Sequence, residues 1–482
     1  MSLLEHVPIG ILPFERFESV LPPERYAELR EAVERSRTEL EGRAVWNVNS
    51  TSRGGGVAEM LVSLLAYAHG AAVDARWTVI AGNDPFFALT KRIHNNLHSS
   101  PGDGGDLGEA EHKIYDDALA PNVEEFKALV KPEDIVIVHD PQPAGLIPPL
   151  KEMGVSVIWR CHVGIDTPSE LSRRAWNFLL PYVQPADAYV FSRKAFVWEG
   201  LDDDKIELIA PVIDAFSPKN QELDPETVGA ILRVAGLNDD GAAGTPTFTR
   251  EDGSPGRVER PATTFEGRML RPDDSVVLQV SRWDRLKDPL GVIRGFVDHI
   301  APYTDAHLVY AGPAVEAVAD DPEGKEVLDE AKHYFGELDP EAKDRVHLTA
   351  LPMDDLAENA AIVNALQRRA DVVVQKSIAE GFGLTVAEGM WKAKPVVATR
   401  IGGIQDQIVD GESGILLDDP TDLAAYGAAV RELLENPERA RAIGRAAMER
   451  VRGDFLAVRS LLQYLALFEK LLARHTAGGV GH

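Results

Sequence analysis

A glycine-rich turn is the first segment of the chain with residue types suited to holding a phosphate-bearing ligand. The run NSTSRGGGVAE over residues 49–59 follows an apolar stretch and opens a helical pattern. Consecutive glycines let the backbone approach a ligand closely, and the N-terminus of the next helix offers unpaired N–H groups. The run matches neither GxGxxG nor the Walker A pattern, because no Gly-Lys-Ser/Thr follows. Its alternative interpretation is a tight strand-to-helix turn.

A basic segment, SRWDRLKD over residues 281–288, follows another apolar run. The chain carries 50 Lys and Arg against 77 Asp and Glu, a formal charge of −27, so cations clustered after a strand indicate an anion site. The Arg282 guanidinium and the Lys287 ammonium can together neutralise a diphosphate and stabilise its departure. The alternative is a solvated charged turn.

Two glutamates eight residues apart stand in EGFGLTVAE, residues 380–388. Gly383 and Leu384 begin a helical pattern, so their N–H groups can hold a phosphate. Carboxylates accept hydrogen bonds from vicinal hydroxyls, so Glu380 can bind a sugar while Glu388 binds a ribose. As a mere charge on a helix face, Glu388 would leave the glycine loop unexplained.

A histidine follows a strand in RCHVGID, residues 160–166, where it can donate a hydrogen bond to a sugar hydroxyl. Its alternative role is structural, and the same holds for His139, which ends another apolar run. The neighbouring Cys161 is expected to be a packed side chain rather than a nucleophile, since no base stands beside it. No histidine cluster with metal-ligand spacing is present, so we expect no metal site.

Short apolar runs alternate with helical patterns along most of the chain, which indicates parallel sheets covered on both faces. The expected strands are 44–49, 77–81, 135–139, 155–160, 188–191, 206–209, 276–281, 308–312, 346–348, 372–375, 396–399 and 414–416. The predicted fold class is therefore α/β, with two doubly wound domains facing a cleft. We place them at 1–225 and 226–455, with a last helix, about 456–482, packing back on the first.

Residues 236–272 are rich in Gly, Pro, Thr and Asp, so we expect a long loop or insertion that contributes no core element.

Composition excludes several classes of protein. No run of about 18 apolar residues exists, which argues against a membrane span. The single cysteine excludes a disulfide framework within one chain. The acidic balance argues against nucleic acid or an anionic membrane as a partner. No secretory signal is readable at the start, so a cytoplasmic location is expected.

The E-x7-E pattern of Glu380 and Glu388, together with Arg282, Lys287 and the glycine turn, resembles glycosyltransferase family 4, whose GT-B fold has two Rossmann-like domains. The resemblance covers about residues 40–475. The segments WNVNSTSRGGGVAEML and WRCHVGID are similar to those members that make trehalose from a nucleoside-diphosphate glucose and free glucose. Trehalose phosphorylases and other retaining members of the family are the nearest alternatives.

The resemblance implies a role for each residue. Arg282 and Lys287 bind the donor diphosphate, Glu388 binds the ribose, and Glu380 and His162 contact the transferred glucose. The remaining implied contacts are Gly55, Gly56, Gly383 and Leu384 for the donor, and Asn49, Gln142 and Lys376 for the acceptor. We expect retention through a front-face route in which the departing diphosphate takes the acceptor proton. The rival is a double displacement with Glu380 as nucleophile.

The same resemblance implies no tightly bound cofactor, because cationic side chains take the place of a metal. A divalent ion would be stimulatory at most. The expected partners are ADP-, UDP- or GDP-glucose and glucose, in a homodimer. A non-catalytic sugar or nucleotide sensor is the alternative from another class. A Rossmann dehydrogenase is disfavoured, because no GxGxxG with a downstream ribose-binding acid occurs.

Overall fold

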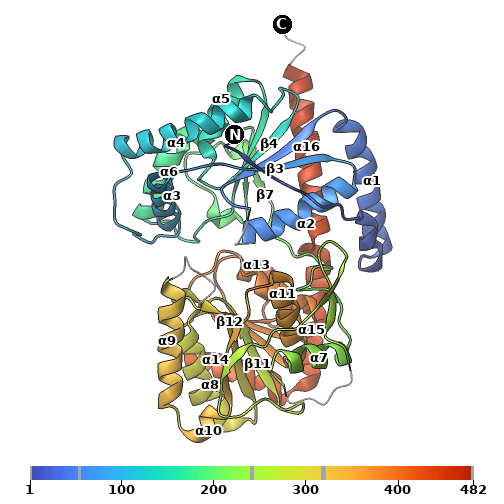
Figure 1. The fold of residues 1–482 in the computed structure, drawn as a ribbon, viewed down its shortest axis with the longest axis vertical. Coiled ribbons are helices and arrows are strands. Elements are labelled where there is room, and N and C mark those ends of the chain that lie inside the picture. Colours follow the sequence, from blue (N-terminus) through green and yellow to red (C-terminus); the bar gives the residue numbers. More distant parts are fainter. Residues whose placement is uncertain (1–2, 53–55, 239–243, 316–321, 479–482) are drawn as a thin grey trace. The chain divides into compact units, whose positions relative to one another are not determined.

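The computed structural model describes residues 3–52, 56–238, 244–315 and 322–478, which form two compact units (Figure 1). The first unit joins Met1–Val212 to Ala457–His482, and the second is Ile213–Leu456. The chain thus divides at 212/213 and 456/457, where the sequence predicts 225/226 and 455/456. Each unit is an α/β layer structure built on its own sheet.

The sheet of the first unit has the strand order β1-β3-β2-β4-β5-β6-β7. β1 pairs antiparallel with β3, and the other neighbours are parallel. The strand order reverses between β2 and β4, and ligands of such sheets bind beyond the carboxyl ends of the strands at this switch point. The strands are β1 Glu5–Val7, β2 Ala44–Asn49, β3 Asp74–Val79, β4 Ile135–His139, β5 Ser156–Cys161, β6 Ala188–Phe191 and β7 Ile206–Leu208.

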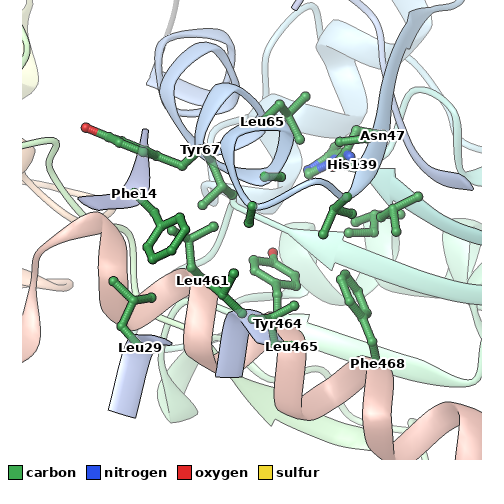
Figure 2. A pocket seen from close by; sticks show the side chains of 18 residues that line it. Phe14, Leu29, Asn47, Leu65, Tyr67, His139, Leu461, Tyr464, Leu465 and Phe468 are labelled. Atoms are coloured by element: carbon green, nitrogen blue, oxygen red, sulfur yellow. The ribbon is translucent and has the colours of Figure 1, made fainter. Parts of the chain in front are cut away.

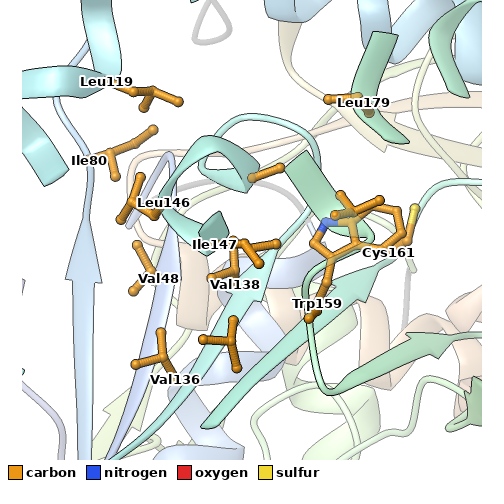
Figure 3. Close-up of a cluster of buried hydrophobic side chains, with 14 of the residues drawn as sticks. Val48, Ile80, Leu119, Val136, Val138, Leu146, Ile147, Trp159, Cys161 and Leu179 are labelled. Atoms are coloured by element: carbon orange, nitrogen blue, oxygen red, sulfur yellow. The ribbon is translucent and has the colours of Figure 1, made fainter. Parts of the chain in front are cut away.

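One face of this sheet carries a large hydrophobic core. Val48, Val136, Val138 and Trp159, from β2, β4 and β5, are fully or nearly fully buried there (Figure 3). Side chains alternate along a strand, so the residues between them point to the opposite face. The helices of the unit are α1 Pro23–Glu39, α2 Gly56–Gly70, α3 Asp84–Leu97, α4 Glu109–Lys127, α5 Ile147–Glu152, α6 Glu170–Val183 and α16 Ala457–Gly478.

Helix α16 returns to the first unit from the end of the chain and lies against α1 and α2. Its residues Leu461, Tyr464, Leu465 and Phe468 recur at helical spacing, so they form one apolar stripe. This stripe closes a mostly apolar cavity of about 60 Å³ over the sheet (Figure 2). The long C-terminal helix therefore completes the core on the second face of the sheet.

The second unit has the strand order β10-β13-β12-β11-β14-β15-β16, parallel except for the edge strand β10. Its switch point lies between β11 and β14. The strands are β10 Thr263–Phe265, β11 Val276–Val280, β12 His307–Pro313, β13 Val346–Leu351, β14 Val372–Gln375, β15 Val396–Thr399 and β16 Ile415–Leu417. The helices are α7 Pro225–Val234, α8 Pro289–His299, α9 Pro322–Glu337, α10 Pro340–Lys343, α11 Leu356–Arg369, α12 Leu384–Trp391, α13 Ile404–Gln407, α14 Leu423–Glu435 and α15 Pro437–Asp454.

The expectation that 236–272 contributes no core element is wrong for the described part, residues 236–238 and 244–272. This part forms the hairpin of β8 (Thr247–Thr249) and β9 (Pro255–Arg257), and it supplies β10 to the sheet. Phe248 and Val258 are buried. The buried Glu358 carboxylate accepts hydrogen bonds from the N–H groups of Glu259 and Arg260, at 2.5 and 2.6 Å. A few anchors therefore order a segment whose composition is polar.

Candidate functional site

Two loops meet at the carboxyl edge of the second sheet, one after β11 and one after β14. Their backbones are joined directly, since the N–H of Ile378 donates to the carbonyl of Leu286 at 2.7 Å. The buried Gln279 side chain joins them again: its Nε2 donates to the carbonyl of Lys287 at 2.9 Å, and its Oε1 accepts from the N–H of Lys376 at 3.1 Å. The predicted basic and acidic segments thus form one structural unit at the switch point.

Lys287 and Glu380 form an ion pair across these two loops. The Nζ to Oε2 distance is 2.5 Å, and the two side chains are only 14% and 13% exposed. Arg282 lies in the first loop with its side chain 65% exposed, and its Nη2 donates to Asp284 Oδ2 at 3.0 Å. An ammonium and a largely accessible guanidinium therefore stand on the loop where the sequence predicts a diphosphate site.

Lys376 is fully buried, and its ammonium bonds to the carboxylate of Asp288. Asp288 has a left-handed backbone with φ +50°, and its Oδ1 caps helix α8 by accepting from the N–H of Gly291 at 3.0 Å. One carboxylate therefore holds the helix start, the basic loop and the end of β14 together. Within the second unit, the ammonium of Lys376 serves as a structural cross-link.

Gly383 directly precedes helix α12 and has φ +79°, a backbone conformation that side chains other than glycine disfavour. Gln407 supports this turn, because its Nε2 donates to the carbonyl of Phe382 at 2.6 Å. The N-terminus of α12, beginning at Leu384, follows the loop of Glu380. The predicted phosphate-holding turn therefore exists as a helix start next to the Lys287–Glu380 pair.

Glu388 lies within α12, and its side chain is only 5% exposed. Its Oε1 is 3.7 Å from the Lys219 ammonium, and its Oε2 accepts from Gln367 Nε2 at 3.4 Å. These contacts are long, so the carboxylate retains capacity to accept hydrogen bonds from hydroxyls.

In the first unit, His162 lies just after β5 and bonds to the end of β4. Its Nε2 is 3.0 Å from His139 Nδ1, and the two rings stack with their planes 14° apart. Its backbone N–H donates to Asp140 Oδ1 at 2.8 Å. His139 in turn contacts Asn47 Oδ1 through Nε2 at 3.0 Å. A chain of three polar side chains therefore runs from β2 to the predicted sugar-contacting histidine.

Burial and the nearby charge of Arg160 keep both histidines neutral. Burial lowers the pKa of His139 to about 3, and burial and the Arg160 cation also lower the pKa of His162. The Asn47 oxygen can only accept, so His139 Nε2 carries the proton and His139 Nδ1 accepts from His162. The nitrogen left on His162, Nδ1, is then an acceptor, whereas the sequence predicts a donor at this residue.

Asn49 is buried at the end of β2, and both ends of its amide are used locally. Its Nδ2 donates to the carbonyl of Thr51 at 2.7 Å, and its Oδ1 accepts from Trp77 Nε1 at 2.9 Å. Gln142 is half-buried in the turn after β4. Asn49, Gln142 and His162 thus follow β2, β4 and β5 along the carboxyl edge of one sheet.

The glycine-rich turn is only partly described. Gly56 begins α2 and is exposed, while Gly55 lies outside the described residues. Cys161 is buried, its thiol donates to the carbonyl of Val163 at 3.1 Å, and burial raises its pKa above the usual range. A protonated, buried thiol agrees with the predicted packing role.

Three residues of these networks were not predicted from the sequence: Gln279, Asp288, and Asn47, the partner of His139. Gln279 and Asn47 each interrupt an otherwise apolar strand, which is a readable signal for a polar group with an internal partner. Asp288 precedes a proline and a helix, the usual position of an N-cap.

Among the described residues, no three His, Cys, Asp or Glu side chains gather closely enough to hold a metal ion. No helix in the described part of the chain has the length and hydropathy needed to cross a bilayer.

Comparison with known proteins places the chain in context. Residues 47–198 match a family model described as the N-terminal domain of trehalose synthase, and residues 263–450 match glycosyl transferases group 1. A trehalose synthase of Rubrobacter xylanophilus is 37% identical over 98% of this chain and 100% of its own. A trehalose phosphorylase of Pleurotus pulmonarius is 26% identical over 76% of this chain, which spans 49% of that longer protein.

Among solved structures, a UDP-forming trehalose-phosphate synthase from Burkholderia xenovorans covers 89% of this chain with a TM-score of 0.63 and 15% identity. At this identity the likeness shows the fold, which is the GT-B arrangement expected from the sequence. The near full-length identity to the Rubrobacter protein carries the stronger conclusion. The chain belongs to the trehalose synthase family of glycosyltransferases.

Proposed function

We propose that the chain transfers glucose from a nucleoside-diphosphate glucose to free glucose with retention of configuration, forming trehalose. The observation that carries this proposal is the Lys287–Glu380 ion pair at the switch point of the second sheet, on a loop that also carries Arg282, in a chain of the trehalose synthase family. Cations at that place suit a diphosphate, and carboxylates suit the hydroxyls of its two sugars.

In this proposal, Arg282 and Lys287 bind the donor diphosphate, aided by the N-terminus of α12 at Gly383 and Leu384. Glu388 accepts hydrogen bonds from the ribose hydroxyls. Two cations and a helix start stabilise the charge that develops on the leaving diphosphate, and this stabilisation needs no metal ion. Once phosphate oxygens engage Lys287, the Glu380 carboxylate becomes free to face the positive charge that develops on the transferred glucose.

The roles on the acceptor side rest on the first unit. His162, held by His139, contacts the transferred glucose through Nδ1, and Asn49 and Gln142 are assigned to the acceptor glucose. The acceptor hydroxyl attacks the anomeric carbon on the face that the diphosphate leaves. The departing phosphate oxygen takes the hydroxyl proton, so configuration is retained without a protein nucleophile.

Product analysis tests the proposal. The protein is incubated separately with ADP-, UDP- and GDP-glucose plus free glucose, and NMR identifies the disaccharide and both anomeric configurations. We expect α,α-linked trehalose with at least one donor. A disaccharide with inverted configuration, or no transfer from any of the three donors, contradicts the proposal.

Trehalose phosphorylase is the second candidate, because the Pleurotus enzyme aligns with 76% of the chain. Incubation with trehalose and phosphate separates the two, since only a phosphorylase releases glucose 1-phosphate from that mixture. A covalent glucosyl adduct on Glu380, trapped with a slow donor analogue and located by mass spectrometry, would replace the front-face route with a double displacement. Binding of NDP-glucose without turnover would point to a sensor.

A further inference from the structure

A basic pocket lies at the amino-terminal edge of the second sheet, away from the loops of the candidate site. Its lining includes Arg368 and Arg369 at the end of α11, before β14, and Lys392 and Lys394 between α12 and β15. Its volume is about 430 Å³. The amino ends of parallel strands share one edge of a sheet, so this amino-edge pocket is on the opposite edge from Lys287 and Glu380.

The carboxylates that line the amino-edge pocket are already bonded to other groups. Both oxygens of Glu222 accept from the Arg368 guanidinium, at 2.8 and 3.0 Å. Asp224 caps helix α7, its Oδ1 accepting from the N–H of Thr227 at 2.8 Å. Arg369 donates to backbone carbonyls, including that of Pro272 at 3.0 Å. The two arginines are therefore satisfied, and so are the acidic groups.

The ammonium groups of the two lysines, in contrast to the arginines, have hydrogen-bond donors left unused. Lys392 is 7% exposed, and its ammonium donates to Asn220 Oδ1 at 3.0 Å and to the carbonyl of Glu388 at 3.1 Å, which leaves a third donor. The Lys394 ammonium has no acceptor or ion-pair partner in the described part of the chain. Burial lowers the pKa of Lys392 to about 7 and also lowers that of Lys394.

A buried amide adds a second observation. Asn238 lines the same pocket, is 5% exposed, and its Oδ1 has no hydrogen-bond partner among the residues that the structure describes. A buried acceptor left without a donor costs about 1–3 kcal/mol, so such groups are usually satisfied by a ligand or an ordered water. The pocket therefore offers two under-used cationic donors and one unused acceptor in a chain of charge −27.

We propose that the amino-edge pocket binds a small phosphate ester, with the phosphate on the ammonium groups of Lys392 and Lys394 and a hydroxyl of the ligand donating to Asn238 Oδ1. The ligand supplies an anion in direct contact with the two lysines, which no described carboxylate does, and the donor that the amide lacks. Lys392 also ends α12, one turn after Glu388. The occupied pocket thus fixes the far end of the helix that begins at the proposed phosphate-holding turn.

Isothermal titration calorimetry at pH 7.5 tests the proposal with two probes, glucose 6-phosphate and inorganic phosphate. We expect the wild-type chain to bind glucose 6-phosphate, and Lys394→Gln to weaken that binding at least tenfold. Lys325→Gln, an exposed lysine on α9, is the matched control and should leave the affinity unchanged. Asn238→Ala should weaken glucose 6-phosphate and not inorganic phosphate. Thermal unfolding of each variant checks that the fold is retained.

Proton linkage gives an independent readout. A bound anion raises the pKa of both lysines, so binding should take up protons, measured as a difference in binding heat between Tris and HEPES. The charged groups that face Lys392 are Glu388, Glu222, Arg368 and Lys219, and those that face Lys394 are Asp371, Arg369 and Arg368. Affinity should therefore fall as pH rises above 7.

Three results overturn the proposal. The first is wild-type chain that binds neither probe. The second is binding that survives Lys394→Gln and is lost in Lys287→Ala, which would assign the phosphate to the donor site. The third is equal affinity for both probes with no effect of Asn238→Ala, which would show that the pocket recognises inorganic phosphate and not a phosphate ester. These binding experiments use no nucleoside-diphosphate glucose. Their results can therefore be interpreted even if the protein does not form trehalose.

Discussion

The ammonium of Lys287 and the carboxylate of Glu380 neutralise each other across two loops with little access to solvent. Removing one partner leaves an unpaired, largely buried charge, so both should be sensitive to substitution for structural as well as chemical reasons. Arg282 differs, because its side chain is mostly exposed and its carboxylate partner is a neighbour in the same loop. Arg282 therefore offers the cleaner test of the proposed diphosphate site.

Arg282→Ala should lower kcat/KM for transfer by about 10²–10³, the usual effect of removing one donor that stabilises developing charge. Arg285→Ala is the matched control, since Arg285 is 53% exposed in the same segment and pairs with Glu330. Steady-state kinetics with saturating glucose measure both variants, and thermal unfolding should leave them close to wild type. If Arg282→Ala keeps a kcat/KM as high as that of Arg285→Ala and the wild type, Arg282 does not bind the diphosphate.

The buried histidines predict how stability depends on pH. The pKa of His139 is about 3 in the fold against about 6.5 in the unfolded chain. Above pH 6.5 the histidine is neutral in both states, so it does not lower the free energy of unfolding there. As pH falls below 6.5, the imidazole takes up a proton in the unfolded chain but not in the fold. This uptake stabilises the unfolded chain, so the free energy of unfolding falls. Between pH 7.0 and 5.5 this amounts to about 1 kcal/mol.

The test compares the wild type with His139→Gln by urea unfolding at pH 7.0 and 5.5. The variant lacks this titration, so its deficit in free energy of unfolding should narrow by about 1 kcal/mol at the lower pH. The comparison also cancels the opposing effect of Asp140, whose pKa burial raises to about 6. A deficit that is the same at both pH values would show that the fold does not lower the pKa of His139.

At the scale of elements, the loop before α12 depends on a close approach by glycine. A Cβ on Gly402, which has φ +48°, would lie 1.8 Å from the carbonyl oxygen of Glu380. Gly411 also has a positive φ, +76°, but its Cβ would meet nothing within 4 Å. The two glycines therefore separate backbone strain from displacement of the Glu380 loop.

Gly411→Ala should lose about 1–2 kcal/mol of stability, the cost of a left-handed backbone, and Gly402→Ala should lose more because its Cβ also meets the Glu380 carbonyl. Gly402→Ala should in addition lower kcat/KM at least tenfold, because the loop that carries Glu380 must move. Gly411→Ala should keep wild-type kinetics. Chemical unfolding and initial rates measure the pair, and unchanged kinetics in Gly402→Ala would mean that the loop position is not critical.

Strands with continuous apolar runs were predictable, because burial on both faces of a parallel sheet leaves that pattern. β10 was not: its three residues, Thr263–Phe265, carry no such run and gain their place only by pairing with β13. The site follows the same division. Cations and carboxylates after strands can be read from spacing, whereas the bonds of Gln279 to two loops, and of Asp288 to Lys376, depend on which strands become neighbours.

At the scale of the whole molecule, the second unit is one continuous segment, Ile213–Leu456, that contains every residue proposed for the diphosphate and ribose. Produced alone, residues 213–456 should fold cooperatively and bind ADP or UDP. Thermal unfolding and calorimetry measure this, with Arg282→Ala in the same segment as the control for specific binding. A segment that folds yet binds no nucleoside diphosphate would place the donor contacts elsewhere.

The first unit is not one continuous segment. Its helix α16 packs against α1 and α2 but follows the whole second unit in the sequence. The crossings at 212/213 and 456/457 are joined by a β-bridge between Ile213 and Leu456. During synthesis, the first unit is the first to emerge from the ribosome, but it cannot complete its fold until α16 has been made. One face of its sheet stays only partly covered, by α1 and α2, until the residues of α16 emerge. A premature stop shortly before Ala457 would then harm the N-terminal half of the protein while sparing the segment nearest the lesion.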